Sequence, residues 1–475
     1  MALANIFGVG LQGKSPNITA QKRVNAYVEM QNDQDKTRLV LIGTPGRELF
    51  TTFGDTPCRG AIAVGDLMYV VHRNTFYEVN NAGTRTSRGT LNTSTGRVDM
   101  CTNGAQVMVV DGTNGYSYTI ASLTFAQISD NDFPNGAYTC SWQNGYFKAE
   151  KTNKFYISAI NDCTSWDATD YGTAEAAPDN IVRVLDDHGE TLIFGTVTME
   201  PWGVTDSTDF PYQLIPGATS EVGLAARNSL AKFDDSVAFL GRNRLGQVQV
   251  YKLRGHAALP ISSPELDSLI NSYTVVGDAT GFSFMLGGHP MYQLNFTQQN
   301  VSLLYDGLAS VQAGQPVWSP LQSGLNGDRD RAEFSCAFVS KVRTFDYENG
   351  NVYNMAPSVY DDNGDPLPFI VQGKHVMAGY DRITVDRLFA DFETGVGTAT
   401  GQGSAPLVGL EVSRDGGHSF GTQMWASLGA IGEFRTRAEW RRLGTARDFV
   451  FRLTVTDPVK RVLVGAAIDA EAGLP

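Results

Sequence analysis

Glycine-closed turns recur throughout this chain and constrain its fold more than any other feature of the sequence. The stretches between the turns are short and rich in aromatic and β-branched residues, which favour strands. With 50 glycines in 475 residues and no collagen period, the sequence predicts an all-β fold built from many hairpins. Asn-Gly and Asp-Gly pairs, which supply the positive φ angles of two-residue hairpin turns, begin at Asn103, Asp111, Asn114, Asn135, Asn144, Asp306, Asn326, Asn349, Asn363 and Asp415.

Between about residues 60 and 365, strands and turns group into repeating units. The first unit reads AIAV, LMYVV, TFYEV and TRTSRG, which is four strands in about thirty residues. A spacing of roughly 35–55 residues is that of β-propeller blades, and we predict about six to seven of them. A series of β-sandwiches, with turns every ~8–12 residues, is the alternative. The predicted units start near Gly60, Gly96, Ala137, Asn180, Ser229, Ala279 and Phe334.

The chain changes character on either side of this repeat. We predict an N-terminal arm with the first strands in residues 1–45, the propeller in residues 46–365 and a C-terminal antiparallel β-domain, like a sandwich, in residues 366–475. The last assignment rests on clean alternation in stretches such as FRTRAEW and FVFRLTV. The clearest helix is expected at residues 264–273, where Pro264 follows two serines that could cap it. We expect this helix to link two units.

Charge, cysteine use and hydropathy exclude several classes of protein. The formal net charge is −13, whereas a protein that grips DNA by neutralising phosphates is normally basic. Such a balance suits ordinary solubility, and it equally suits the wall of a DNA conduit. The five cysteines form no CxxC pair, which predicts neither disulfides nor a thiolate metal site and fits synthesis in a reducing cytoplasm. No apolar run reaches the ~18–20 residues of a membrane span, and we expect no signal peptide.

One nucleotide-binding pattern occurs, in residues 8–15. The stretch GVGLQGKS matches GxxxxGK[ST], and its glycines also match GxGxxG. A phosphate-binding loop works only between a buried strand and a helix, and neither flank qualifies, because Pro16 and β-branched Ile18 and Thr19 follow the match. Asp111, which ends the apolar stretch VMVVD, lies in a turn and not at a magnesium site. We therefore predict no nucleotide site at Lys14.

The remaining candidates for chemistry are ordinary turn residues. The six histidines are far apart and form neither HxxxH nor HExxH, and no GxSxG motif is present. Paired acids such as Asp186–Asp187 and Asp361–Asp362 could serve glycoside hydrolysis, but they lie in turn contexts, where Asp caps its own backbone. We predict no catalytic, cofactor-binding or metal-binding residues, and no enzyme.

Two motifs in the C-terminal part have structural interpretations. SRDGGHSF resembles the Asp-box turn of sialidase-type propellers and is expected to shape a hairpin and not to catalyse; its residues are Ser413, Asp415, Gly416, Gly417 and Phe420. A basic strip follows. It could contact DNA phosphates or an acidic neighbouring subunit, or it could be the solvent-exposed face of a sandwich. Its residues are Arg435, Arg437, Arg441, Arg442 and Arg447, with Arg452, Lys460 and Arg461 beyond them.

Much of the chain resembles one family, the tail nozzle or packaged-DNA stabilisation proteins of short-tailed bacteriophages. The resemblance is carried by RVNAYVEM…IGTPGRELF near the N-terminus, by PWGVTDSTDFPYQLIPGATSEVGLAARNSLAKFDDSVAFLGRNRLGQVQVYKL and PISSPELDSLINSY in the middle, and by LVGLEVSRDGGHSFG and LGAIGEFRTRAEWRRLGTARDFVFRLTVTDPVKRVLVGAAIDAEAG near the end. It spans most of the chain in order, as many weak positions and not as one motif.

The resemblance implies a structural virion protein. Such proteins form a ring, typically of six subunits, below the portal and its adaptor, where they continue the DNA channel, help retain packaged DNA before ejection and dock needle, fibre or spike proteins. DNA would pass through the lumen without sequence-specific binding, and the family brings no cofactor and no catalytic residues. The alternative is a glycan-binding tail propeller, in which scattered aromatics such as Trp142, Trp166, Trp202 and Trp318 would stack on sugars.

Overall fold

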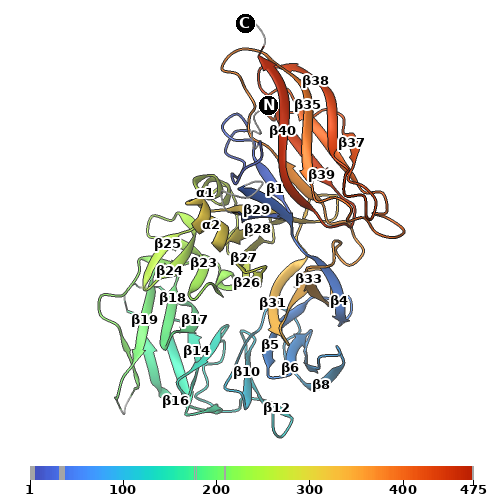
Figure 1. Cartoon of the computed structure of the whole chain (residues 1–475). Helices are drawn as coiled ribbons and strands as arrows, with labels where there is room; N and C mark the ends of the chain where they lie inside the picture. The colour runs from blue at the N-terminus through green and yellow to red at the C-terminus, as the bar shows by residue number, and fades with distance from the viewer. Residues whose placement is uncertain (1–5, 32–37, 176, 178, 208–209, 473–475) are drawn as a thin grey trace.

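The chain folds into a ring of antiparallel sheets that carries a two-sheet sandwich on one side (Figure 1). The computed structural model describes residues 6–31, 38–175, 177, 179–207 and 210–472. Within these residues there are nine sheets, of which seven form the ring and two the sandwich. The predicted all-β fold, a propeller with a sandwich-like domain, is confirmed.

The seven sheets of the ring are the blades of a β-propeller, and in five of them the strands pair in chain order. Blades 1 to 3 comprise β5 (Cys58–Val64), β6 (Leu67–His72), β7 (Thr75–Val79) and β8 (Arg85–Thr90); β9 (Asp99–Thr102), β10 (Gln106–Val110), β11 (Gly115–Thr119) and β12 (Thr124–Gln127); and β13 (Cys140–Gln143), β14 (Tyr146–Lys151), β15 (Lys154–Ala159) and β16 (Asp162–Thr173).

Blades 4 to 6 follow the same plan, with two extra short strands. They comprise β17 (Ile181–Asp187), β18 (Glu190–Gly195), β19 (Met199–Val204) and β20 (Tyr212–Leu214); β21 (Val222–Leu224), β22 (Ala231–Lys232), β23 (Val237–Asn243), β24 (Val248–Arg254) and β25 (Ala257–Pro260); and β26 (Thr280–Leu286), β27 (His289–Phe296), β28 (Val301–Asp306), β29 (Trp318–Ser323) and β30 (Asp328–Arg329).

The seventh blade closes the ring by joining both ends of the propeller segment. It consists of β31 (Ala332–Phe338), β32 (Lys341–Asp346), β33 (Asn351–Ala356) and, from far earlier in the chain, β4 (Gly46–Thr52). Because β4 pairs with β33 along its length, the first and last parts of the propeller are held together by backbone hydrogen bonds. Closure of this kind leaves each blade edge short and protected.

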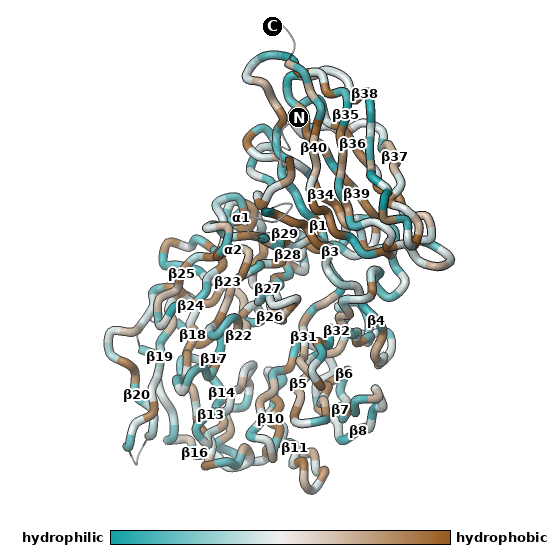
Figure 2. The backbone as a smooth tube through the Cα atoms, in the orientation of Figure 1, coloured by the Kyte–Doolittle hydropathy of each residue, from teal (hydrophilic) through white to brown (hydrophobic). Residues whose placement is uncertain are grey.

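Hydrophobic cores between neighbouring blades explain why the ring holds together. Met68 and Val70 of blade 1 pack with Phe334 and Phe345 of blade 7, and a buried cluster likewise joins each other pair of successive blades. Figure 2 shows hydrophobic stretches along strands such as β10 and β39. Because each blade buries its faces against two neighbours, no blade has a complete core of its own, as in other repeat architectures.

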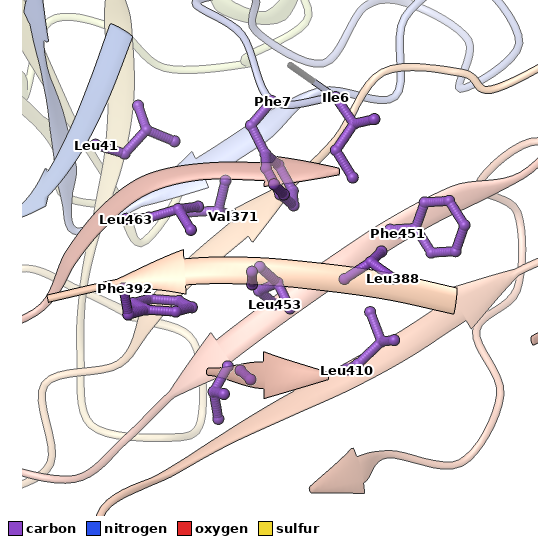
Figure 3. Close-up of a cluster of buried hydrophobic side chains, with 14 of the residues drawn as sticks. Ile6, Phe7, Leu41, Val371, Leu388, Phe392, Leu410, Phe451, Leu453 and Leu463 are labelled. Atoms are coloured by element: carbon purple, nitrogen blue, oxygen red, sulfur yellow. The ribbon is translucent and has the colours of Figure 1, made fainter. Parts of the chain in front are cut away.

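The sandwich packs two five-stranded sheets face to face over one core (Figure 3). Strand β35 shows the expected alternation, with Val385, Leu388 and Ala390 buried. One sheet orders β1 (Lys22–Val24), β34 (Phe369–Gln372), β39 (Val450–Val455), β36 (Leu407–Ser413) and β37 (Met424–Ser427); the other orders β2 (Ala26–Met30), β3 (Leu39–Gly43), β40 (Val462–Ala472), β35 (Ile383–Phe392) and β38 (Ala438–Ala446). The sandwich thus includes strands from both ends of the chain.

Two short helices and a 3₁₀ turn, η1 (Arg227–Ser229), complete the described structure. Helix α1 (Pro264–Ile270) lies between β25 and β26, where a helix was expected to link two units, and the Ser263 side chain accepts the N–H of Leu266 as its cap. Helix α2 (Gly307–Ala313) begins at Asp306, where the sequence predicted a hairpin turn. That prediction is wrong, because the Asp306 carboxylate accepts the Ala309 N–H and a helix-forming stretch follows.

Two of the predicted Asn-Gly turns have both residues at positive φ. These are Asn144-Gly145, at 55° and 88°, and Asn363-Gly364, at 55° and 93°. A β-branched residue at either place would be strained, so the Asn-Gly pair determines where the strands reverse.

The division of the chain at residues 45 and 365 remains a proposal. Strand β4 begins at Gly46 and the first sandwich strand after the seventh blade begins at Phe369, while β1 to β3 lie in the sandwich sheets.

Candidate functional site: the junction between propeller and sandwich

The chain crosses between propeller and sandwich on both sides of the propeller segment, and three arginines are buried at these crossings. Arg23, Arg47 and Arg461 are 1%, 4% and 1% exposed. A buried guanidinium is costly unless its donors are used. The partners of these three side chains therefore show what the junction is built to hold.

Arg23, in β1, ties three separate segments to one another. Its Nη1 donates to the carbonyl oxygens of Gly8 at 2.8 Å and Gly10 at 3.0 Å, and its Nη2 donates to that of Trp318 in blade 6 at 3.0 Å. Burial lowers the pKa of Arg23 to about 10, so the guanidinium stays charged at neutral pH. The N-terminal arm, the sandwich and blade 6 therefore share one cation.

Asn25 is the residue at which the chain passes from one sandwich sheet to the other. Its φ of 51° is left-handed, which asparagine tolerates, and it separates β1 from β2. Its Nδ2 donates to the carbonyl oxygens of Gln322 and Pro368, both at 2.8 Å, and its Oδ1 accepts the Gln322 N–H at 2.9 Å. A side chain at the kink thus connects β29 of the propeller to the start of the C-terminal domain.

Arg461 holds together the two segments that connect the propeller to the sandwich. Its Nη1 donates to the carbonyl oxygen of Leu367 at 2.6 Å, and its Nη2 donates to that of Thr44 at 3.1 Å. A Cβ at Gly43 would lie 2.8 Å from Arg461 Nε, so only glycine lets this side chain pass. Leu367 lies just before the sandwich strand β34, and Thr44 lies between β3 and β4.

Arg47, in β4, lies between two buried carboxylates. Its Nη2 is 2.6 Å from Asp330 Oδ2 and its Nη1 is 3.0 Å from Asp362 Oδ1. Burial acts to raise the pKa of Asp362, but the charge and hydrogen bonds of Arg47 bring it below its usual value. This cluster joins blades 6 and 7 to the segment that leads into the sandwich.

His289, at the start of β27, faces the sandwich through Tyr27 of β2. The two ring centroids are 5.5 Å apart, and His289 Nδ1 lies 2.9 Å from Asp306 Oδ1. The hydrogen bond to Asp306 raises the pKa of His289 above its ordinary value, against the effect of burial. The hydrogen bond between His289 and Asp306 is therefore part of the folded junction.

We expect this pair to make stability pH-dependent. Because the folded pKa is raised, its contribution is complete below the unfolded value of about 6.5 and is lost as pH rises through the folded pKa. His289→Gln should lose this decline. Urea unfolding of both proteins between pH 5.5 and 8.5 measures the difference, and parallel curves for the two proteins would contradict the assignment.

The stretch that matches a phosphate-binding loop is a coil whose carbonyl oxygens bind a cation. At residues 8–15 the carbonyl oxygens of Gly8 and Gly10 receive the Arg23 guanidinium, whereas a phosphate cradle needs converging N–H groups. No strand precedes the coil and no helix follows it among the described residues. Asp111, the other residue of that pattern, accepts the N–H groups of Thr113 and Asn114 in a turn.

The Asp-box-like turn follows β36 as a compact hydrogen-bonded loop. Asp415 Oδ1 accepts the Ser413 hydroxyl at 2.6 Å and the Ser419 N–H at 2.9 Å, and Ser413 Oγ accepts the Gly417 N–H at 2.8 Å. These bonds hold the pKa of Asp415 well below its usual range. Gly416 and Gly417 have φ of 70° and 91°, and the Arg452 guanidinium lies 3.6 Å from the Phe420 ring centroid.

Asp415→Ala should lower the free energy of unfolding by about 1 kcal/mol, as loss of a capping side chain does. Ser413→Ala should also lower the free energy of unfolding, because it removes the hydrogen bond from the Ser413 hydroxyl to Asp415. Chemical denaturation measures both. Unchanged stability in the two variants would show that the turn forms without these side chains.

The basic strip lies on an exposed edge of the sandwich. Arg441 and Arg442 both point to solvent, since a register shift in β35 opposite them and a φ of 62° at Arg442 interrupt the alternation of edge strand β38. Arg441 Nε lies 2.6 Å from Glu439 and Arg437 Nε lies 3.5 Å from Asp391. Arg435 and Arg447 are exposed in the flanking loops.

Large exposed hydrophobic residues accompany the strip. Trp425 of β37 is 53% exposed, and Ile431 and Phe434, in the loop that leads to β38, are 62% and 74% exposed. Strands β37 and β38 are edge strands and contact each other. We call Trp425, Ile431, Phe434 and the five arginines of the strip the edge surface. Exposed aromatic and arginine side chains together are typical of protein contact sites.

The other candidates from the sequence are structural. Trp166 and Trp318 are buried, and their Nε1 atoms donate to the carbonyl oxygens of Cys163 and Ile261 at 2.8 and 2.7 Å. Trp142 and Trp202 are half-buried against cores between blades. Asp186 pairs with Lys148 at 2.9 Å. Within the described ranges no group of three or more His, Cys, Asp or Glu side chains could hold a metal ion, and the five cysteines are free and buried.

Sequence reasoning missed the junction. Arg23, Asn25 and Arg47 lie in ordinary strand-like stretches, and their partners are up to about 340 residues away. No sequence signal marks these residues, because Lys22 and Arg23 stand side by side in β1 and only the structure shows that Arg23 is buried. No helix in the described part of the chain is long and apolar enough to cross a membrane.

Comparison with known proteins agrees with this architecture. Residues 6–360 match the family model described as bacteriophage P22 Gp10, beta-propeller, and residues 369–471 match the one described as bacteriophage P22 Gp10, beta-sandwich. The tail hub protein gp10 of Salmonella phage P22 is 25% identical over 336 residues, which is 67% of each chain.

The similarity to solved structures is low. A chain of a mitotic checkpoint complex has a TM-score of 0.44 at 10% identity, covering 69% of this chain and 95% of that one. The WD40 propeller domain of Doa1 has a TM-score of 0.39 at 10% identity, covering 66% and 98%.

Proposed function

Because this chain belongs to the family of bacteriophage P22 Gp10, a structural component of the phage tail, we propose that it forms the ring-shaped nozzle of a short tail. The ring, of six subunits, would lie below the portal and adaptor and continue the DNA channel. It would help retain packaged DNA before ejection and dock needle, fibre or spike proteins. The family resemblance seen in the sequence is confirmed, and the nozzle, stoichiometry and partners are the proposal.

The junction is the observation that supports this role best. Three buried guanidinium groups, those of Arg23, Arg47 and Arg461, hold the arm, the propeller and the sandwich together. The propeller and the sandwich would therefore move as one body. A subunit that retains DNA under pressure must transmit force without bending between its domains. A closed propeller with a core between every pair of blades is suited to that task.

Charge supports the same proposal. The net charge of −13 would keep DNA from adhering to a channel wall. The edge surface carries five arginines although the chain is acidic overall. This basic surface fits contact with an acidic face of a neighbouring subunit. A heterologous contact of this kind closes into a ring when the rotation between subunits divides a full turn. A non-enzymatic role is part of the proposal.

Purified protein tests the proposal by light scattering after size exclusion and by negative-stain images. We expect rings, and we expect the double substitution of Arg441 and Arg442 by Glu to dissociate them while leaving the thermal unfolding temperature unchanged. Substitution by Glu of Arg244, which is exposed on blade 5 and far from the sandwich in the sequence, is the matched control. A protein that stays monomeric at all concentrations and is missing from virions would refute the proposal.

The glycan-binding alternative gains no support from the tryptophans. Of the four that the sequence suggested, Trp166 and Trp318 lie in cores and Trp142 and Trp202 are half-buried. The well-exposed Trp425 belongs to the edge surface defined above.

A further inference from the structure

A cavity of about 320 Å³ lies where the first strands of several blades converge. Gly60 of β5, Met100 of β9, Arg183 of β17, Ser283 of β26 and Ser335 of β31 all line it. These strands belong to five different blades, so the cavity lies at the axis of the propeller. Its wall is made largely of strands that the ring closure fixes in place.

The cavity is basic although the chain as a whole is acidic. The charged residues that line it are Arg97, Asp99, Arg183 and Lys232, three of them cations. Asp99 is already engaged, since its Oδ1 lies 3.1 Å from Arg183 Nη2 and its Oδ2 accepts the Cys140 N–H at 3.1 Å. Lys232 lies at the exposed side, 3.7 Å from Asp187. The lining therefore lacks an anion for Arg97.

Arg97 has buried donors with nothing to bind. Its guanidinium lies flat over Phe334, 4.0 Å from the ring centroid, yet its Nε and Nη1 are buried without a hydrogen-bond partner. Arg183 Nε is also buried and unsatisfied. The nearest further acid, Glu333, pairs with Arg329 at 2.8 Å. Burial lowers the pKa of Arg97, but an arginine stays protonated at neutral pH.

We propose that this axial cavity binds a small tetrahedral oxyanion, such as inorganic phosphate, between Arg97 and Arg183. The lining carries three cations and one engaged carboxylate, and an oxyanion would balance this charge. The buried donors of the two arginines carry a penalty until a small shift of the side chains gives them an acceptor. The guanidinium fork matches two oxygens of a phosphate, and the volume is ample for one. The bound anion would join the start of blade 2, just before β9, to β17 of blade 4. This site is independent of the tail role proposed above.

Thermal unfolding of the purified full chain in phosphate, acetate and chloride at equal ionic strength provides the first test. Phosphate should raise the unfolding temperature above the chloride value, and calorimetric titration should give one phosphate per chain. Arg97→Met, which keeps an apolar side chain over Phe334, should weaken binding at least about tenfold. Arg88→Met, at a half-buried pair with Glu78 outside the cavity lining, should leave binding unchanged.

Each result of these experiments either supports or overturns the phosphate site. Titration of the unaltered protein needs no variant, so the proposal can fail even if Arg97→Met does not fold. No phosphate-specific shift and no heat of binding would overturn it, as would full binding by Arg97→Met. A shift in acetate equal to that in phosphate would also overturn it, because the site would then recognise a carboxylate and not a tetrahedral oxyanion.

Discussion

Arg47→Met is expected to lower the free energy of unfolding by about 3–5 kcal/mol, the cost of removing one partner from a buried ion pair. The substitution removes the cation between the buried carboxylates of Asp330 and Asp362. Gln293 and the Ala332 N–H still donate to Asp330, whereas Asp362 keeps the Ser323 hydroxyl and, at 3.7 Å, Arg331. Arg47 lies in β4, the strand that closes the seventh blade. The loss should therefore open the ring as well as weaken the junction.

Chemical denaturation at pH 7 measures this effect, with Arg441→Met as the control at an exposed pair. The control should change stability by less than about 1 kcal/mol, the usual range for surface ion pairs. The triple variant that combines Arg47→Met with Asp330→Asn and Asp362→Asn should recover part of the loss, because the two buried carboxylates that Arg47 neutralises are then gone. A change of less than about 1 kcal/mol for Arg47→Met would contradict the role given to this cluster.

Arg23→Met is expected to release the N-terminal arm and to lower the free energy of unfolding by about 2–4 kcal/mol. Three carbonyl oxygens, those of Gly8, Gly10 and Trp318, lose charge-assisted hydrogen bonds of about 1.5 kcal/mol each, and part of this sum is offset because the freed carbonyl oxygens bind water. Ile6 and Phe7, which are buried in the sandwich core (Figure 3), are held there by the same arm. Release of the arm therefore also exposes apolar surface.

Limited proteolysis detects that release directly. Cleavage near Lys14 should become faster in Arg23→Met than in the unaltered chain, while cleavage at exposed sites in the propeller should not change. Arg23→Lys keeps the charge but not the fork, and it should give an intermediate result. Equal cleavage rates near Lys14 in all three proteins would show that other contacts, such as that of His375 Nε2 with the Pro16 carbonyl oxygen at 2.7 Å, hold the arm alone.

Local chemistry explains which parts of the fold could be read from the sequence. Turn pairs such as Asn144-Gly145 specify where strands reverse, and the seven predicted unit starts lie within about eight residues of the first strands of the seven blades. The helix at Pro264 has a cap, a proline and an apolar face within a few residues. The hairpin turn predicted at Asp306-Gly307 was wrong because the same pair can begin a hairpin or cap a helix. The residues that follow the pair decide between the two structures.

The junction could not be predicted, because its partners are distant in the sequence. Nothing near Asn25 indicates Pro368, and nothing near Arg461 indicates Thr44. The strip was recognised as basic, but its outer members Arg452 and Arg461 proved to have different surroundings: Arg452 lies over Phe420, and Arg461 is buried at the junction. Composition shows where charge is concentrated, whereas only the tertiary structure shows which charges are buried.

A cryo-electron microscopy map of the virion that contains this chain tests the central claim most directly. The account predicts a closed ring of this protein in the tail, with seven-bladed propellers and sandwiches in fixed relative orientation and the edge surface against a neighbouring subunit. A tail without such a ring, or subunits whose sandwiches take different orientations relative to their propellers, would contradict it.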